Sequence, residues 1–425
     1  MSIHVILLLL LMVSMGIFII QYLLYKKVKI DAAYVVGFCL YFDMFGYFYK
    51  LAMPGNALFL LIAVPLIPVV IAWFSKDRKA REILSDGGIW LWFIVLLYGI
   101  VSLAWTTYGS AGLSKEAILI IHAIIPGIYA YILYKKYGKF SWKTLALFGL
   151  IFALVHLLLG EYSPEYPGRL SLPGSNPILN ARMSLITITV CLWRREIPLY
   201  IRIITITAAT VSALATQSRG PIVAFVIANL IVLVFFIYKR YKHGEFKHLS
   251  KYVVISIFIL LAGVITASQY SREIDQWVGG SRFGVFFDRA ELQGDNNFIG
   301  RLDLQRKAID KWTDHPFFGG GLGSVTPPIA RDFPHNVVLE IASEMGVVGL
   351  LLWSFAYLYS IWVSRRNGLL LALLFQTLGT ALISGDFGFN FEYVLISIVA
   401  LALIPNNKRV GEESHAQGII SNYKF

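Results

Sequence analysis

The sequence predicts an all-α polytopic membrane protein with about 12–13 transmembrane helices and one large helical loop outside the membrane. Of its 425 residues, 57% are hydrophobic and only 15% are charged, whereas roughly a quarter of the residues in soluble domains are charged. The mean hydropathy is +0.67, and apolar runs recur near the length of ~20 residues that a helix needs to cross a bilayer. These observations exclude a soluble domain, and the continuous runs also differ from the alternating strands of an outer-membrane barrel.

The apolar runs give the position of each predicted span. By residue number they cover 3–25, 31–52, 57–74, 89–106, 117–134, 144–160, 179–193, 198–215, 220–238, 252–268, 346–363, 368–384 and 390–404. The first run lacks the basic start and the small-residue cleavage site of a signal peptide, so we expect it to be retained as a span.

Basic residues gather in alternate connections between these runs. Of the 37 Lys and Arg residues, 24 lie there, namely Lys26, Lys27, Lys29, Lys76, Arg78, Lys79, Arg81, Lys135, Lys136, Lys139, Lys143, Arg194, Arg195, Arg202, Lys239, Arg240, Lys242, Lys247, Lys251, Arg365, Arg366, Lys408, Arg409 and Lys424. Because basic residues mark cytoplasmic loops, the pattern predicts an N-terminus outside the cytoplasm and a C-terminus inside it. It also accounts for the net charge of +12 without nucleic acid as a partner.

One long connection divides the chain. Residues 269–345 hold eleven acidic and eight basic residues and no run long enough to span a membrane, and connections of this length usually have a function. Within this connection, residues 298–313 have apolar residues at helical spacing, and Pro316 ends the predicted helix. We therefore divide the chain into N-terminal spans (1–160), spans with arginines near the outer face (161–268), the large outer loop (269–345), C-terminal spans (346–404) and a cytoplasmic tail (405–425).

Four glycines in five positions, residues 319–323, follow the predicted helix of the large loop. Glycine tolerates positive φ, so such a cluster lets the backbone approach a bulky ligand or make a tight turn. The sequence leaves both interpretations open for Gly320 and Gly321. A phosphate-binding loop is excluded because no Lys-Ser or Lys-Thr pair follows the glycines.

His335 is the best candidate for a catalytic base. Pro334 and the apolar run from Val337 place it in the first turn of a predicted helix, where the positive end of the dipole disfavours imidazolium. A neutral imidazole can accept a proton, with Asn336 beside it for orientation. The alternative is an exposed or helix-capping histidine.

Two arginines lie near the outer membrane face, opposite to the side that topology signals favour. Arg219 follows the eighth apolar run, and Arg182 lies just inside the seventh. An arginine at such a depth is costly unless it is paired or faces a wet cavity, and its guanidinium fork matches phosphate oxygens. They therefore indicate an anionic, lipid-linked ligand, unless they reach lipid headgroups or pair with Asp386 or Glu392.

The order of these motifs resembles the O-antigen ligase and O-antigen polymerase superfamily over roughly residues 165–390. The motifs are Ser218-Arg219-Gly220 at the end of a span, a basic loop, a further span, and a large outer loop with Arg301, Trp312, Pro316, the glycines, His335-Asn336 and Glu344-Met345-Gly346. The resemblance implies a GT-C-type membrane glycosyltransferase in the bacterial inner membrane, with a periplasmic N-terminus. Its donor is a glycan linked to undecaprenyl pyrophosphate, and its acceptor is lipid A core in the ligases or a second lipid-linked repeat unit in the polymerases.

The resemblance also implies roles for single residues. Arg219 and Arg301 match the arginines that hold the donor pyrophosphate, and His335 matches the histidine that activates the acceptor hydroxyl. We expect the remaining substrate-binding residues to be Arg182, Asn336, Trp312, Gly320 and Gly321. The outer loops contain no Asp-x-Asp, so we expect a reaction that needs no metal, with arginines in place of the divalent cation. The leading hypothesis is an inverting glycosyltransferase without a cofactor.

Three functions remain as alternatives at this point. The ligase is preferred over a polymerase of the same superfamily, and whether loss of the protein leaves unattached polymer or single repeat units would distinguish them. A flippase or transporter of lipid-linked oligosaccharide is the third. Transporters usually show repeats and charges distributed through the spans, whereas here the polar residues gather at one face, which favours the enzyme.

Overall fold

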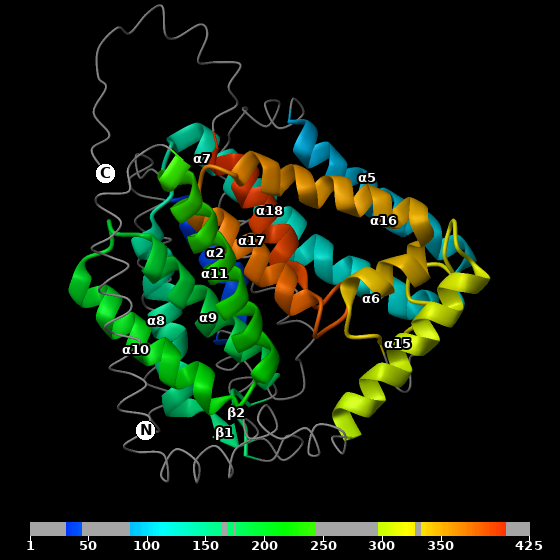
Figure 1. Ribbon diagram of the computed structural model, residues 1–425, viewed down its shortest axis with the longest axis horizontal. Coiled ribbons are helices and arrows are strands. Elements are labelled where there is room, and N and C mark those ends of the chain that lie inside the picture. The colour runs from blue at the N-terminus through cyan, green and yellow to red at the C-terminus, as the bar shows by residue number, and fades with distance from the viewer. Residues whose placement is uncertain are drawn as a thin grey trace, which may run out of the picture.

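Apolar helices packed side by side form the body of the molecule (Figure 1). The structure is a computed structural model that describes residues 31–44, 86–162, 168–173, 175–242, 296–327 and 333–404. The predicted spans at 3–25, 57–74 and 252–268 and the tail 405–425 lie outside the described residues. Within the described ranges, every other predicted span contains a helix, so the predicted polytopic all-α class is confirmed there.

The described elements fall into two groups along the chain. The first group is α2 (Ala32–Leu40), α5 (Gly87–Ser102), η2 (Leu103–Trp105), α6 (Gly109–Leu119), η3 (Ile120–Ile124), α7 (Ile125–Tyr137) and α8 (Trp142–Leu159). The second group is β1 (Glu161–Tyr162), β2 (Leu170–Ser171), α9 (Pro177–Trp193), α10 (Leu199–Ala215), α11 (Arg219–Lys242), α15 (Asn296–Asp314), α16 (Val337–Ser364), α17 (Gly368–Ala381) and α18 (Phe391–Leu403).

Polar caps fix where several helices begin. The side chains of Asp31, Asp86 and Asn176 each accept a hydrogen bond from a main-chain N–H of the first helical turn, which satisfies a donor that has no partner within the helix. Gly138 ends α7 with φ 63°, a left-handed conformation that favours glycine. Short polar signals between apolar runs therefore set the helix boundaries.

The helices pack into two groups that meet where α17 packs on α18 and on α16. In one group α10 packs on α8 and α9, while α11 packs on α17 and α9; in the other, α16 packs on α5, and α18 packs on α7 and η3. Among the described residues, five helical segments are long and apolar enough to cross a membrane: Gly87–Trp105, Gly109–Tyr137, Trp142–Leu159, Arg219–Lys239 and Val337–Ser364. Large apolar side chains of α5, α10 and α11 point outwards, as expected for surfaces that face lipid.

Two long helices depart from regular geometry. A π-helical turn, η3, comes directly before Pro126, where a proline ring disturbs the regular α-helical pattern. Helix α16 is interrupted at Gly346, with φ 67° and ψ −168°. The predicted span 346–363 begins at this interruption, but the helix extends back to Val337.

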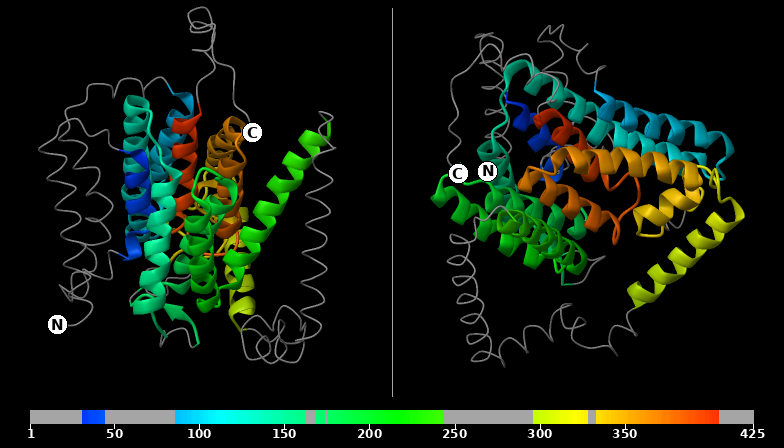
Figure 2. Two further views of the ribbon diagram at one scale, coloured as in Figure 1. Left: turned by 90° about the vertical axis from the view of Figure 1, so that its left-hand side faces the viewer. Right: turned by 45° about the horizontal axis from the view of Figure 1, so that its top comes forward.

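The β1–β2 hairpin and α15 lie toward the same end of the bundle, opposite the end at which α18 finishes (Figure 2). The strands pair antiparallel, with Glu161 opposite Ser171 and Tyr162 opposite Leu170. Helix α15 confirms the helix predicted over 298–313 and extends it by two residues at its start and one at its end. Both segments belong to connections predicted to lie outside the cytoplasm, so the fold brings these connections to one face.

Candidate active site

Two arginines from distant helices donate to neighbouring carbonyl groups in the connection between α17 and α18. Nη2 of Arg182, on α9, donates to the Ser384 carbonyl at 2.9 Å. Nη1 of Arg301, on α15, donates to the Ile383 carbonyl at 3.1 Å. We call residues 383–390 the arginine loop, because its carbonyl groups bind the guanidinium groups of two arginines that are 119 positions apart in the sequence.

Arg182 is only 1% exposed, and its partners explain how the fold tolerates its charge. Nη1 pairs with the Glu392 carboxylate at 3.3 Å, and the guanidinium lies 5.3 Å from the centre of the Phe389 ring. The alternative interpretation of an acidic partner is thus right for Glu392. Nε is buried without a hydrogen-bond partner among the described residues, and a direct role of Arg182 in substrate binding stays a prediction.

Arg219 is the first residue of α11, so the expectation that it closes the preceding helix is wrong. Helix α10 ends at Ala215, and a turn with φ 48° at Gln217 separates the two helices. Arg219 is half-buried. Its neighbour Gly220 lies against the arginine loop, because a Cβ built on Gly220 would be 3.0 Å from Cδ1 of Ile383. The backbone of Arg219 therefore comes near the same loop that binds Arg301.

Arg169 supports this turn, and sequence reasoning missed it. It is 5% exposed. Its Nε donates to the Thr216 carbonyl at 2.9 Å, and its Nη2 donates to Oγ of Ser218 at 2.6 Å. The only signal in the sequence was an arginine after a glycine in an outer connection, and that signal does not identify a partner 47 residues away.

His335 lies before α16 and not in its first turn, which corrects the sequence expectation. The helix begins at Val337 with Asn336 as its N-cap, and His335 has φ 53°. Its ring lies 4.3 Å from the Phe333 ring, centre to centre, and its buried Nδ1 has no hydrogen-bond partner among the described residues.

The surroundings of His335 favour the expected neutral state, but through burial and nearby positive charges and not through the helix dipole. Burial, followed by the positive charges of Arg301 and then Arg182, lowers the pKa of His335 from 6.5 to about 4. The imidazole is therefore neutral at ordinary pH and lies within the electrostatic reach of both arginines.

Asn336 has a local structural role. Its Oδ1 accepts hydrogen bonds from the N–H groups of Val338 at 3.0 Å and Leu339 at 3.2 Å. The capping function considered for His335 thus belongs to the next residue. Any contact between Asn336 and a substrate stays a prediction.

The glycine cluster fits into the interruption of α16. The N–H groups of Gly320 and Gly321 donate to the carbonyls of Ser343 and Glu344 at 2.9 and 2.8 Å, which the broken helix leaves without intrahelical partners. Gly321 has φ 90°, and a Cβ there would lie 2.5 Å from Cα of Thr106. Tight packing accounts for the glycines, and a role in lining a ligand stays a prediction.

Trp312 occupies the last turns of α15. Its Nε1 donates to the Pro316 carbonyl at 3.3 Å, so the indole fastens the end of the helix to the chain that leads into the glycine cluster. Substrate binding by Trp312 also stays a prediction.

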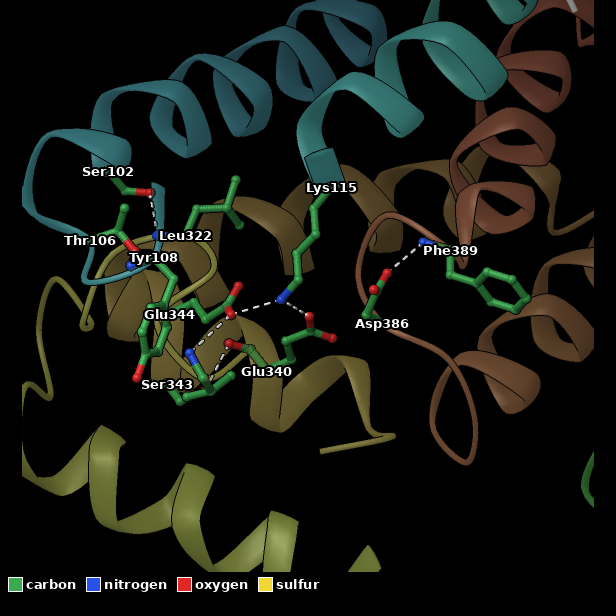
Figure 3. A network of polar contacts seen from close by, with 11 residues as sticks. Ser102, Thr106, Tyr108, Lys115, Leu322, Glu340, Ser343, Glu344, Asp386 and Phe389 are labelled. Carbon is green, nitrogen blue, oxygen red and sulfur yellow. Dashed lines mark hydrogen bonds and ion pairs between the residues drawn. The ribbon is translucent and has the colours of Figure 1, made fainter. Parts of the chain in front are cut away.

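A buried lysine contacts the start of α16, and the sequence analysis missed it as well. Lys115 of α6 is 3% exposed. Its ammonium group pairs with Glu340 and, at 2.8 Å, with Glu344, both on α16 (Figure 3). Lys115 lies 225 positions from Glu340 and 229 positions from Glu344, so no local pattern connects the lysine to the glutamates.

One family model matches the chain, and it carries the description O-antigen ligase. The match covers residues 204–354, which include most of α10, all of α11 and α15, and the first part of α16. No curated protein sequence matches the chain. The matched range contains Arg219, Arg301 and His335, and it confirms the resemblance drawn from the motif order. Residues 204–354 are therefore similar to the O-antigen ligase family, and this match supports the resemblance to the O-antigen ligase and polymerase superfamily.

Proposed function

We propose that this protein transfers a glycan from undecaprenyl pyrophosphate to an acceptor hydroxyl of lipid A core, at the periplasmic face of the bacterial inner membrane. The reaction class is that of an inverting, metal-independent glycosyltransferase of GT-C type. The observation that carries the proposal is the neutral His335 within the electrostatic reach of two arginines that bind one loop. A base beside a cationic site suits a reaction with an anionic leaving group.

The arginines supply the charge that the donor needs. A pyrophosphate leaving group develops negative charge as its bond to the sugar breaks, and guanidinium groups stabilise that charge. Arg219 and Arg301 are assigned to the pyrophosphate. Arg182, already paired with Glu392, maintains the arginine loop and adds positive potential.

His335 is assigned to the acceptor. As the acceptor oxygen forms its bond to the anomeric carbon, the bond between that carbon and the pyrophosphate oxygen breaks, and the acceptor proton passes to the imidazole. Attack on the face opposite the leaving group inverts the configuration. The products are the glycosylated acceptor and undecaprenyl pyrophosphate.

Replacement of His335 by Ala tests this assignment. We expect the His335→Ala protein in nanodiscs to bind the donor nearly as well as wild type and to lose single-turnover transfer, because the arginines remain in place. His315→Ala is the matched control, since this second histidine of the same loop is exposed. Transfer at the wild-type rate would eliminate the base role, and loss of donor binding in a folded protein would move His335 to the pyrophosphate site.

The acceptor is tested with two substrates offered to the purified protein. We expect glycan to appear on lipid A core. Elongation of a second lipid-linked repeat unit, with no product on lipid A core, would instead identify the polymerase. Movement of the intact donor across a vesicle bilayer without transfer would identify a flippase.

The proposed orientation is tested with single cysteines at two exposed positions. Lys139 follows α7, and Arg306 lies on α15. An impermeant reagent applied to intact spheroplasts should label position 306 and leave position 139 unlabelled. The reverse labelling would overturn the assignment of the site to the periplasmic face.

A further inference from the structure

A break in the helical geometry separates the start of α16 from the rest of that helix. We call residues 335–345 the histidine segment. At its end, Gly346 has φ 67° and ψ −168°, so regular hydrogen bonding does not continue across this point. The long membrane-crossing part of α16 therefore does not by itself fix where His335 lies.

Lys115 fastens the histidine segment to α6. Its ammonium group pairs with Glu340, one turn and a half after His335, and with Glu344 one turn later. All three side chains are buried. Buried ion pairs hold their groups at defined positions, and removal of one partner leaves an uncompensated charge.

The backbone of the same residue contacts the arginine loop. A Cβ built on Gly388 would lie 2.7 Å from both Cα and the carbonyl oxygen of Lys115. The loop is also braced internally, because the N–H of Phe389 donates to Oδ1 of Asp386 at 2.6 Å. Figure 3 shows Asp386 and Phe389 on one side of Lys115, and Glu340 and Glu344 below it. One residue thus contacts both halves of the site.

We propose that Lys115 is a positioning residue that holds the histidine segment in register with the arginine loop. Its side chain fixes the segment that carries the base, and its main chain abuts the loop that binds the arginines. This inference rests on the proposed function, since the register matters for transfer between a donor and an acceptor. Its ammonium group is buried against Glu340 and Glu344, so we assign it no contact with a substrate.

The charge count sharpens the test. The ammonium group forms ion pairs with two carboxyl groups and also lies within the electrostatic reach of Asp386. Oε2 of Glu340 and Oε2 of Glu344 are buried without hydrogen-bond partners among the described residues. Replacing Lys115 alone therefore combines two effects, loss of the tether and burial of unpaired acid groups. Replacing all three charged side chains by uncharged ones removes the burial of unpaired acid groups and leaves only the loss of the tether.

The experiment compares Lys115→Met with the triple variant Lys115→Met, Glu340→Gln, Glu344→Gln. Each is purified in nanodiscs, and thermal stability, donor affinity and single-turnover transfer are measured. We expect Lys115→Met to lower the melting temperature and the transfer rate, the latter at least tenfold, with the donor Kd within threefold of wild type. The triple variant should regain the melting temperature and not the rate. Lys143→Met is the matched control, because Lys143 is exposed on α8.

Hydrogen–deuterium exchange of residues 337–345 gives a readout that is independent of catalysis. Exchange there should rise in both Lys115 variants and remain unchanged in Lys143→Met. If the triple variant recovered both the transfer rate and the protection from exchange, Lys115 would only neutralise charge. A wild-type transfer rate in Lys115→Met would also overturn the proposal. If wild type transfers no glycan, the proposed function fails, and unaltered exchange in the Lys115 variants would separately refute the tether.

Discussion

Replacement of Gly346 by alanine should damage the site without touching any residue assigned to chemistry. Gly346 has φ 67° and ψ −168°, a region that only glycine adopts readily. Other residues there cost on the order of 1–3 kcal/mol. In addition, a Cβ at this position would lie 2.2 Å from the Phe317 carbonyl oxygen. The chain that enters the glycine cluster would have to move.

The hydrogen bonds at the interruption set the magnitude. The N–H groups of Val347 and Val348 donate to the carbonyls of Pro316 and Phe317 at 2.9 and 3.2 Å. Each such bond contributes about 1 kcal/mol net. Weakening both, together with the backbone strain, gives a local destabilisation of about 2–5 kcal/mol.

Hydrogen exchange and transfer can both measure this loss. A destabilisation of about 2 kcal/mol corresponds to a rise of about 30-fold in the exchange of these amides if they exchange by local opening. We expect the rate of glycan transfer to fall with it, because the histidine segment loses its support. Gly87→Ala is the control, since nothing lies within 4 Å of a Cβ at that position. Unchanged exchange and transfer in Gly346→Ala would refute the role assigned to the interruption.

Three further predictions follow from the charges of the site. Arg301→Lys should lose at least about tenfold in single-turnover transfer, because an ammonium group cannot reproduce the guanidinium fork; full turnover at normal expression would remove it from the mechanism. Arg182→Met leaves Glu392 buried and unpaired, so a loss of about 3–5 kcal/mol in stability is expected, and thermal unfolding at an unchanged midpoint would contradict it. For the pH profile, neutral His335 is the active form, so activity falls as pH decreases through its pKa. For the donor, kcat/KM should decrease on the acid side near the free-protein pKa of about 4. The decrease in kcat should lie at higher pH, because bound pyrophosphate favours imidazolium. If both decreases occurred at the same pH, this coupling would be excluded.

Local signals in the sequence were sufficient for the helices. Apolar runs and the stop at Pro316 predicted most described helices to within a few residues, although α6 begins at Gly109, eight residues before the span predicted at 117–134. The break inside α16 was not predicted. The sequence indicated a helix from Val337 and a span from residue 346, but not that Gly346 would interrupt the helix and leave free groups that another segment binds.

The pairing of charged residues could not be predicted in the same way. Lys115 lies in a weakly polar stretch before a predicted span, and nothing local indicates that two glutamates from α16 surround it. Arg182 had two candidate partners, Asp386 and Glu392, and only the packing of α9 against the end of the arginine loop selects one. Such pairs depend on tertiary contacts, so the sequence identifies candidate partners and only the fold determines which of them pair.

The different origin of the His335 pKa changes how the proposed reaction is controlled. A helix dipole is a fixed source of potential, whereas the charge of Arg301, which we assign to the pyrophosphate together with Arg219, can be compensated by a ligand. With a pKa of about 4 the free imidazole is a weak base. A pyrophosphate bound at the arginines would offset their charge and raise that pKa toward the operating pH, where a general base is most effective. The arginines would then do more than stabilise the leaving group, because donor binding would itself strengthen the base that activates the acceptor.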